Sequence, residues 1–292
     1  MRTKQLAIRQ VFDVPLLEIS GLGQRPRSPE QKGMQILAVG DEDFTVVSAG
    51  VESAGSLSDF RTHRLNDLLD EGDEYGSQWE AADGDPTGRV FILQESPGKV
   101  FVLSAELDRL LHTIDLSVEG NDRLDWKKSP NAQGEGLVLL ANGHVVVAKE
   151  KEPPLLMEFG PEGDEASGIV SDLLLLERRR FPEPAEASSE HVVLTIWDLD
   201  GEADARIDDI SDVAVGPDER LYLLSDESQC IARVEHQLPA EERKLSITAM
   251  WKLPEEIVQP EGLVLLDEMT PLVAIDRKEP NKNLFLLDPL TS

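Results

Sequence analysis

The sequence predicts an all-β protein, and within that class a β-propeller, because one repeat of short strands recurs along the chain. Residues 80–103 align without a gap on residues 211–234. Residues 133–159 share the stretches "EGLVLL" and "KEP" with residues 259–287. A weaker copy opens at Glu18 with "EISGLG". Internal repeats of this kind indicate a fold built from equivalent units.

Each copy reads as strand, turn, strand, turn, strand. The strands carry Val, Ile, Leu and aromatic residues, and the turns carry Gly, Pro, Asp and Asn. Repeats with three or four short strands, recurring about every 50 to 76 residues, are typical of propeller blades. The equivalent first-strand positions are Ser20, Glu80, Glu135, Ser211 and Glu261.

The last repeat is too short to be complete, so we expect the N-terminal segment to finish it. Residues 4–14, "KQLAIRQVFDV", have the composition of a closing strand. We favour five blades in a single domain over residues 1–292, with a loop-rich insertion at about 160–190. Six blades are the alternative, because the insertion could hide a degenerate blade.

The charge balance restricts the partners. The net charge is −29, which repels nucleic acid and anionic membranes and attracts cations. No run approaches the roughly 20 apolar residues of a membrane span, and the N-terminus has no sustained apolar stretch. Cys230 is the single cysteine, and we interpret it as a structural thiol. We expect a soluble, cytoplasmic protein that binds a small molecule or a protein on its top face.

The repeat predicts where acidic side chains gather. In a propeller the first strand of each blade lines the central channel, and the end of the second strand lies at the same face. Four repeats carry an acid at the end of the second strand, whereas the first, read near Val47 and Ser48, has none. These acids are Glu95, Glu150, Asp226 and Asp276. Two residues before the first-strand positions lie Glu18, Gln78, Gln133, Asp209 and Gln259.

Seven carboxylates in a narrow mouth cannot all be ionised and without partners. A hard divalent cation is one solution, and the all-oxygen ligand set favours Ca²⁺. Salt bridges and protonated acids available for acid–base chemistry are others, and the acids could also simply tie blades together. The predicted metal ligands are Glu80, Glu135, Glu261, Glu95, Glu150, Asp226 and Asp276. The predicted ligand-binding or neutralising residues are Glu18, Asp209, Lys149, Lys151 and Arg277.

Known catalytic motifs are missing: no Walker loop, Rossmann fingerprint, HExxH or GxSxG occurs. The five histidines are scattered, and His144, at a turn into a strand, is expected at the surface. We therefore favour a noncatalytic binding module with a cation at its mouth. The alternative is a metal-assisted hydrolase of a lactone, ester or phosphoester, with Glu80, Glu135 or Asp226 as ligands or bases.

The quoted repeats resemble the SdiA-regulated family of β-propellers. The resemblance rests on "EISGLG", "WEAAD…VFILQES", "GEGLVLL…VVVAKEKEP", "DISDVAV…LYLLSDES" and "PEGLVLL". They are also similar to phytase-like esterase and gluconolactonase-type propellers. The resemblance implies a propeller with an acidic channel mouth and a bound calcium ion. In the gluconolactonase group the metal lies on channel acids, which Glu18 and Asp209 match, and on an asparagine, which nothing here matches.

Overall fold

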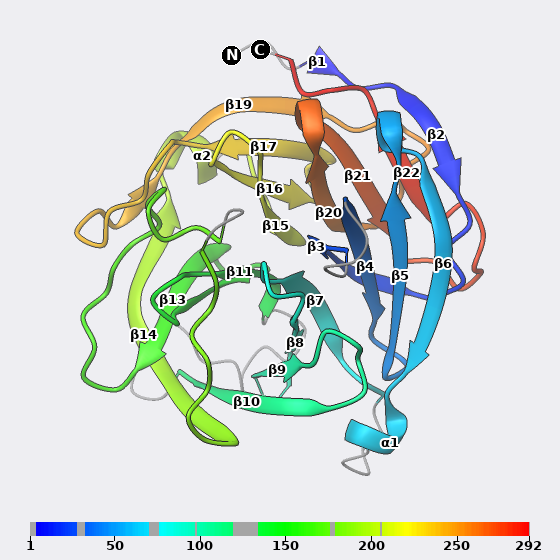
Figure 1. The fold of residues 1–292 in the computed structure, drawn as a ribbon. Helices are drawn as coiled ribbons and strands as arrows, with labels where there is room; N and C mark the ends of the chain where they lie inside the picture. The colour runs from blue at the N-terminus through cyan, green and yellow to red at the C-terminus, as the bar shows by residue number, and fades with distance from the viewer. Residues whose placement is uncertain are drawn as a thin grey trace.

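The computed structural model describes residues 4–27, 33–69, 76–96, 98–118, 134–175, 179–204 and 206–291. These residues form mostly short β-strands arranged around a common centre (Figure 1). Backbone pairing forms four sheets, and the antiparallel pairs within them divide the strands of this part of the chain into five units. The predicted all-β class is therefore confirmed.

The first three units use consecutive stretches of the chain. The first contains β3 (Ile19–Pro26), β4 (Met34–Gly40), β5 (Thr45–Val51) and β6 (Leu57–Arg64). The second contains β7 (Trp79–Gly84), β8 (Val90–Gln94), β9 (Lys99–Leu103) and β10 (Leu110–Ser117). The third contains β11 (Gly134–Leu139), β12 (Val145–Lys149), β13 (Leu155–Pro161) and β14 (Ser188–Leu199).

The last two units recruit strands from the N-terminus. The fourth contains β15 (Asp212–Val215), β16 (Leu221–Ser225), β17 (Cys230–Val234), β19 (Ile247–Lys252) and, in parallel, β1 (Lys4–Gln5). The fifth contains β20 (Pro260–Leu266), β21 (Thr270–Ile275), β22 (Leu284–Leu287) and β2 (Ile8–Phe12). The remaining elements are β18 (Lys244–Leu245), which pairs with β14, the helices α1 (Asn66–Leu69) and α2 (Gly201–Asp204), and the 3-10 turns at Ser53–Gly55 and Asp267–Met269.

Hydrophobic packing between neighbouring units explains why the middle strands are mostly apolar. Every residue of β8, β12, β16 and β21 is buried, because neighbouring units cover both faces of these strands. The outermost strand β6, in contrast, has no fully buried residue. Five core clusters fill the five junctions, and the junction of the last unit with the first packs Val264 and Leu272 against Ile36 and Val47. Each fully buried aliphatic side chain contributes about 1.5–3 kcal/mol.

The N-terminal strand completes the fifth unit as predicted. β2 pairs antiparallel with β22, with Phe12 opposite Leu284. The fully buried Asn283 holds the following residues: its side chain accepts from the Val14 amide at 2.8 Å and donates to the carbonyls of Val14 and Leu16, both at 3.0 Å. β20 contacts β3, which joins the last unit to the first.

The predicted insertion lies between β13 and β14. In its described residues it forms two isolated bridges, Leu140 with Leu174 and Ile169 with Leu238. It returns to the sheet at β14, whose first residues pair in parallel with β10. This pairing, which the sequence did not predict, joins the second and third units into one sheet. Neither helix of the described chain has the length or apolar character needed to cross a bilayer.

Asn283→Ala should destabilise the protein by about 2–3 kcal/mol, because it removes the hydrogen-bond partners of the Val14 amide and the Leu16 carbonyl, whereas the Val14 carbonyl keeps the Leu16 amide. The free energy of unfolding, measured with urea, checks this. Asn281→Ala is the matched control, since its side chain contacts only the exposed Glu279 among the described residues. Equal stability of the two variants would contradict the role assigned to Asn283 in holding the N-terminal segment.

Candidate functional site

A β-bulge lies at the start of the first strand in four units. In the second unit Trp79 pairs with Gln94 and Ala81 with Leu93, so Glu80 is the extra residue. The same irregularity places Ser20, Glu135 and Glu261 at the equivalent position. A bulge leaves one residue out of the ladder and redirects its side chain. The repeat position found in the sequence is therefore a bulge position, and its side chains line a common pocket.

The residues two positions earlier share a backbone conformation. Glu18, Gln78 and Gln259 have φ of 45°, 50° and 53°. The Gln78 amide donates to the Asp41 carbonyl at 2.8 Å, and the Glu18 amide to the Arg277 carbonyl at 2.9 Å. Each bond joins the beginning of one unit to the residues just after the second strand of its neighbour. Gln133, the predicted equivalent in the third repeat, lies outside the described residues.

Serine at the bulge position acts differently from glutamate. The Ser20 hydroxyl donates to the carbonyl of Trp79 in the next unit. Ser211, just before β15, donates in the same way to the Pro260 carbonyl at 2.7 Å. These hydroxyls link neighbouring units. The sequence allowed such a linking role for every residue at this repeat position, and the two serines have it. The glutamates at this position instead extend into the pocket.

The second ring of acids is complete, which corrects the prediction that the first repeat lacks one. β4 ends at Gly40, so Asp41 follows the second strand, whereas Val47 and Ser48 lie in the third strand, β5. An acid follows the second strand in every unit: Asp41, Glu95, Glu150, Asp226 and Asp276. The stretch "ILAVGDED" could have revealed Asp41, because it matches the apolar strand and acid of the other copies.

The two sets of acids meet in one pocket of about 220 Å³. Its lining residues are Glu18, Ser20, Asp41, Glu80, Glu95, Glu135, Glu150, Glu261 and Asp276. We call this pocket the acidic mouth. Six of the seven predicted metal ligands line it. Asp226 does not, although its charge contributes to raising the pKa of Glu261.

Burial and mutual repulsion raise the pKa values of several acids at the mouth. Burial, followed by the charges of Glu95 and Asp41, raises the pKa of Glu80 to about 8. Burial, followed by the charges of neighbouring acids with Glu80 among them, raises the pKa of Glu135 and of Glu261 well above the usual range. Burial also raises the pKa of the rim acids Asp41, Glu150, Asp226 and Asp276. Without a bound cation, the surroundings of the inner glutamates therefore favour their protonated form.

Of the three basic side chains predicted to neutralise the mouth, one contacts an acid that lines it. Lys151 contacts Glu150 at 2.6 Å. Lys149 instead donates to the Lys151 carbonyl, and Arg277 contacts Glu279 at 3.4 Å. Lys278 contacts Glu18 at 3.4 Å, although the sequence did not predict a role for this lysine. Within the described residues, the lining carboxylates outnumber the lysines that contact them.

Asp209 holds a turn and does not line the mouth. Its buried carboxylate accepts hydrogen bonds from the Ser225 hydroxyl and from the amides of Asp226 at 3.1 Å and Glu227 at 3.0 Å. These bonds fix the chain directly after β16. The structure thus gives Asp209 a positioning role in place of the ligand contact that the sequence predicts.

The mouth suits a hard cation by chemistry but does not present a finished coordination shell. All its side-chain donors are oxygens, which Ca²⁺ and Mg²⁺ prefer. Across the described residues, however, no three His, Cys, Asp or Glu side chains are placed to hold one metal ion. Carboxylates would have to turn toward a common point to bind a cation.

His144 is buried, which corrects the prediction that it lies at the surface. Its Nδ1 lies 2.6 Å from Glu158 and its Nε2 lies 3.2 Å from Asp164. Burial alone would lower the pKa of His144, but the hydrogen bonds and charges of the two acids outweigh burial and raise it. Glu158 also accepts from the amides of Ser167 and Gly168, so this network anchors the insertion.

Glu80→Gln should stabilise the protein at pH 8 and have little effect near pH 4.5. The carboxyl of Glu80 has a pKa of 4.5 in the unfolded chain and about 8 in the folded protein, so the folded protein loses stability as the pH rises through that interval. Glutamine stays neutral and has no such effect. Allowing for partial solvent exposure, we expect a gain of about 1–2 kcal/mol at pH 8. Urea unfolding at both pH values measures it, with exposed Glu190→Gln as control. A destabilised variant at pH 8 would contradict the account.

The chain is similar to proteins of known structure and matches one protein family. The glutaminyl cyclase of Myxococcus xanthus superposes with a TM-score of 0.54 and 12% identity, covering 98% of each chain. Virginiamycin B lyase from Staphylococcus aureus has a TM-score of 0.42 and 9% identity, over 99% of this chain and 75% of the lyase. A comparison with curated proteins gives no match. The SdiA-regulated family model matches residues 80–285, and the chain, with its propeller-type fold, belongs to the SdiA-regulated family.

Proposed function

We propose that the protein is a five-bladed propeller, a single domain, whose acidic mouth binds a divalent cation and presents it to a small ligand. The observation that carries the proposal is the convergence of eight carboxyl side chains on a pocket of about 220 Å³. Five inter-unit core clusters and the contact of β20 with β3 support the blade count. Among the described residues, the insertion adds only isolated bridges and no sheet of its own.

Calcium is the cation that the pocket favours. Ca²⁺ takes six to eight oxygen ligands in flexible geometry, whereas Mg²⁺ requires a strict octahedron. A ring of acids from several units can adapt to the flexible geometry of Ca²⁺ more easily than to the octahedron of Mg²⁺. Glu80, Glu135 and Glu261 are the inner ligand candidates, with Glu95, Glu150 and Asp276 at the rim. Binding would replace protons by the cation, because ligands must be deprotonated to bind.

The ligand of the loaded mouth is expected to be small and not strongly anionic. The net charge of −29 and the surrounding carboxylates disfavour nucleic acid and anionic membranes. A cation held in the mouth offers a local site for a carbonyl or hydroxyl oxygen. Lys151 and Lys278, at the rim, are the nearest basic partners that contact lining acids.

A metal-assisted hydrolase is the second candidate, and Glu80 favours it. Once a cation has displaced its proton, the Glu80 carboxylate can accept a proton from an attacking water, which a general base must do. The fold is compatible with catalysis, since the glutaminyl cyclase of Myxococcus xanthus shares it. A bound cation would polarise a substrate carbonyl, and Glu80 would take the proton of the water that attacks it.

Ca²⁺ should raise the melting temperature of the protein, and EDTA should reverse the effect. At a hundredfold excess over Kd, binding to the folded state stabilises by about 2.7 kcal/mol. The gain should be larger at pH 8 than at pH 5, because protons compete for the same carboxylates. Glu135→Gln should reduce the gain, and exposed Glu190→Gln should preserve it. Unfolding curves that Ca²⁺, Mg²⁺ and EDTA leave unchanged would reject cation binding.

The hydrolase is tested separately by turnover. Lactones, aryl esters and phosphoesters are assayed with Ca²⁺ and after EDTA treatment. Activity that depends on metal and falls at least about 100-fold in Glu80→Gln supports the enzyme, since general base catalysis contributes about 10²–10⁴-fold. No turnover with any of the three substrate classes, in protein that still binds Ca²⁺, supports the binding module.

A further inference from the structure

A second cavity lies at the outer edge of the second and third units and shares no residue with the acidic mouth. Its volume is about 320 Å³. Residues 181–189, the last part of the insertion, form one wall, which we call the strap. β9 and β10 supply Val102, His112 and Ile114 on another side.

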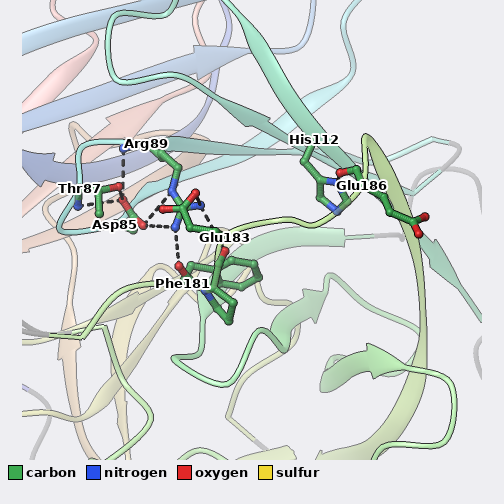
Figure 2. Close-up of polar contacts among 8 residues, drawn as sticks. Asp85, Thr87, Arg89, His112, Phe181, Glu183 and Glu186 are labelled. Carbon is green, nitrogen blue, oxygen red and sulfur yellow. Dashed lines mark hydrogen bonds and ion pairs between the residues drawn. The ribbon is translucent and has the colours of Figure 1, made fainter.

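A buried arginine fixes the first end of the strap (Figure 2). Arg89 forms an ion pair with Asp85 at 2.6 Å, and both side chains are almost fully buried. Its guanidinium also donates to the carbonyls of Phe181 and, at 3.2 Å, Pro182. The Phe181 ring packs against Phe91 with centroids 4.9 Å apart. Because a buried arginine with several partners is costly to displace, this end of the strap is held firmly.

The second end is held by β10. His112 contacts the Glu186 carbonyl through Nδ1 at 2.8 Å and the Ser189 hydroxyl through Nε2 at 2.8 Å. The Thr113 amide donates to the Ala187 carbonyl at 3.0 Å. With both ends fixed, the residues between them arch over the strands. The cavity is thus part of the folded architecture and does not depend on a loose loop.

The size and lining of the cavity define the ligand that it can hold. Val102, Ile114, Phe181, Pro182 and Pro184 make much of the lining apolar. An apolar cavity of about 150 Å³ accommodates benzene. The volume of about 320 Å³ therefore suits a fused two-ring molecule. Glu183 and Glu186, on the strap, disfavour an anionic ligand.

His191 lines the cavity and carries a buried atom without a partner. Its side chain is buried, and its Nε2 donates to the Gly143 carbonyl at 3.1 Å. Burial lowers the pKa of His191 and favours the neutral ring, in which Nε2 carries the hydrogen that faces the Gly143 carbonyl and Nδ1 is the acceptor. Nδ1 has no hydrogen-bond partner among the described residues. Buried polar atoms in this state are uncommon and call for a partner.

We propose that this cavity binds a small, uncharged, fused-ring molecule that donates one N–H hydrogen bond to His191 Nδ1. The apolar rings occupy the space beneath the strap, against Val102, Ile114 and Phe181. Nδ1 is covered in the free protein, so the ligand must displace the side chains that cover it. Indole has the required size and a single N–H donor, and it is the probe for the test.

The test compares indole with 1-methylindole by protein NMR titration. Indole should bind the wild type about 5- to 10-fold more tightly, because 1-methylindole leaves Nδ1 without a donor. His191→Phe keeps an aromatic ring but has no acceptor nitrogen, so the two probes should bind it equally. Ala185→Phe, on the strap, should weaken both probes, whereas Ala187→Phe, exposed and outside the lining, should not.

No binding of indole at about 5 mM, well above the Kd that a nine-atom ligand can reach, would overturn the proposal. Equal binding of both probes by the wild type would also overturn it, as would unchanged binding in Ala185→Phe. Glu135→Gln should bind indole like the wild type, so a failure here is separate from a failure of cation binding at the acidic mouth.

Discussion

Repulsion among carboxyl groups at the acidic mouth is the constraint on which the rest of the structure depends. In each unit an acid follows the second strand at the same face of the ring. The bulges in three first strands add Glu80, Glu135 and Glu261 inside this ring of acids. Like charges at this spacing raise one another's pKa values or recruit a cation. The protein must therefore hold protons, or a cation, wherever its fold is intact.

Backbone bonds between units oppose this repulsion. The carbonyls of Asp41, Glu150 and Arg277, just after second strands, each accept an amide from the next unit. Ser20 and Ser211 add hydroxyl links at bulge-equivalent positions that carry no acid. The five core clusters and the β2–β22 pair close the ring behind these links. Packing thus offsets the electrostatic cost of gathering the acids and fixes the positions of their backbones.

The alignment of the repeats in the sequence predicted much of this arrangement. Glu80, Glu135 and Glu261 could be assigned to one ring because equivalent strand positions become neighbours whenever equivalent units pack around an axis. Asp41 was missed because the first copy is weak, and its third strand was taken for the second. The bulge itself could not be seen in the sequence, since glutamate and serine both occupy it without a distinctive turn residue.

Contacts made by the insertion were beyond the repeat pattern. Arg89 and His112 lie inside a recognised repeat, but their partners Phe181 and Glu186 lie in a segment with no counterpart in the other units. His144 was expected at the surface for the same reason: Asp164, one of the two acids that bury it, belongs to the insertion. The partners in these contacts are far apart in the sequence, and no repeated position relates them. Such contacts cannot be predicted until the path of the chain is known.

The most direct test of the central claim is an NMR titration of the glutamate side-chain carboxyl carbons, assigned through Glu80→Gln, Glu135→Gln and Glu261→Gln. Without a cation, these three carboxyls should titrate well above 4.5, with Glu80 near 8. With saturating Ca²⁺, their apparent pKa values should fall, because the cation favours the ionised form. Titration of all three near 4.5, unchanged by Ca²⁺, would show that the acids do not share one repulsive site.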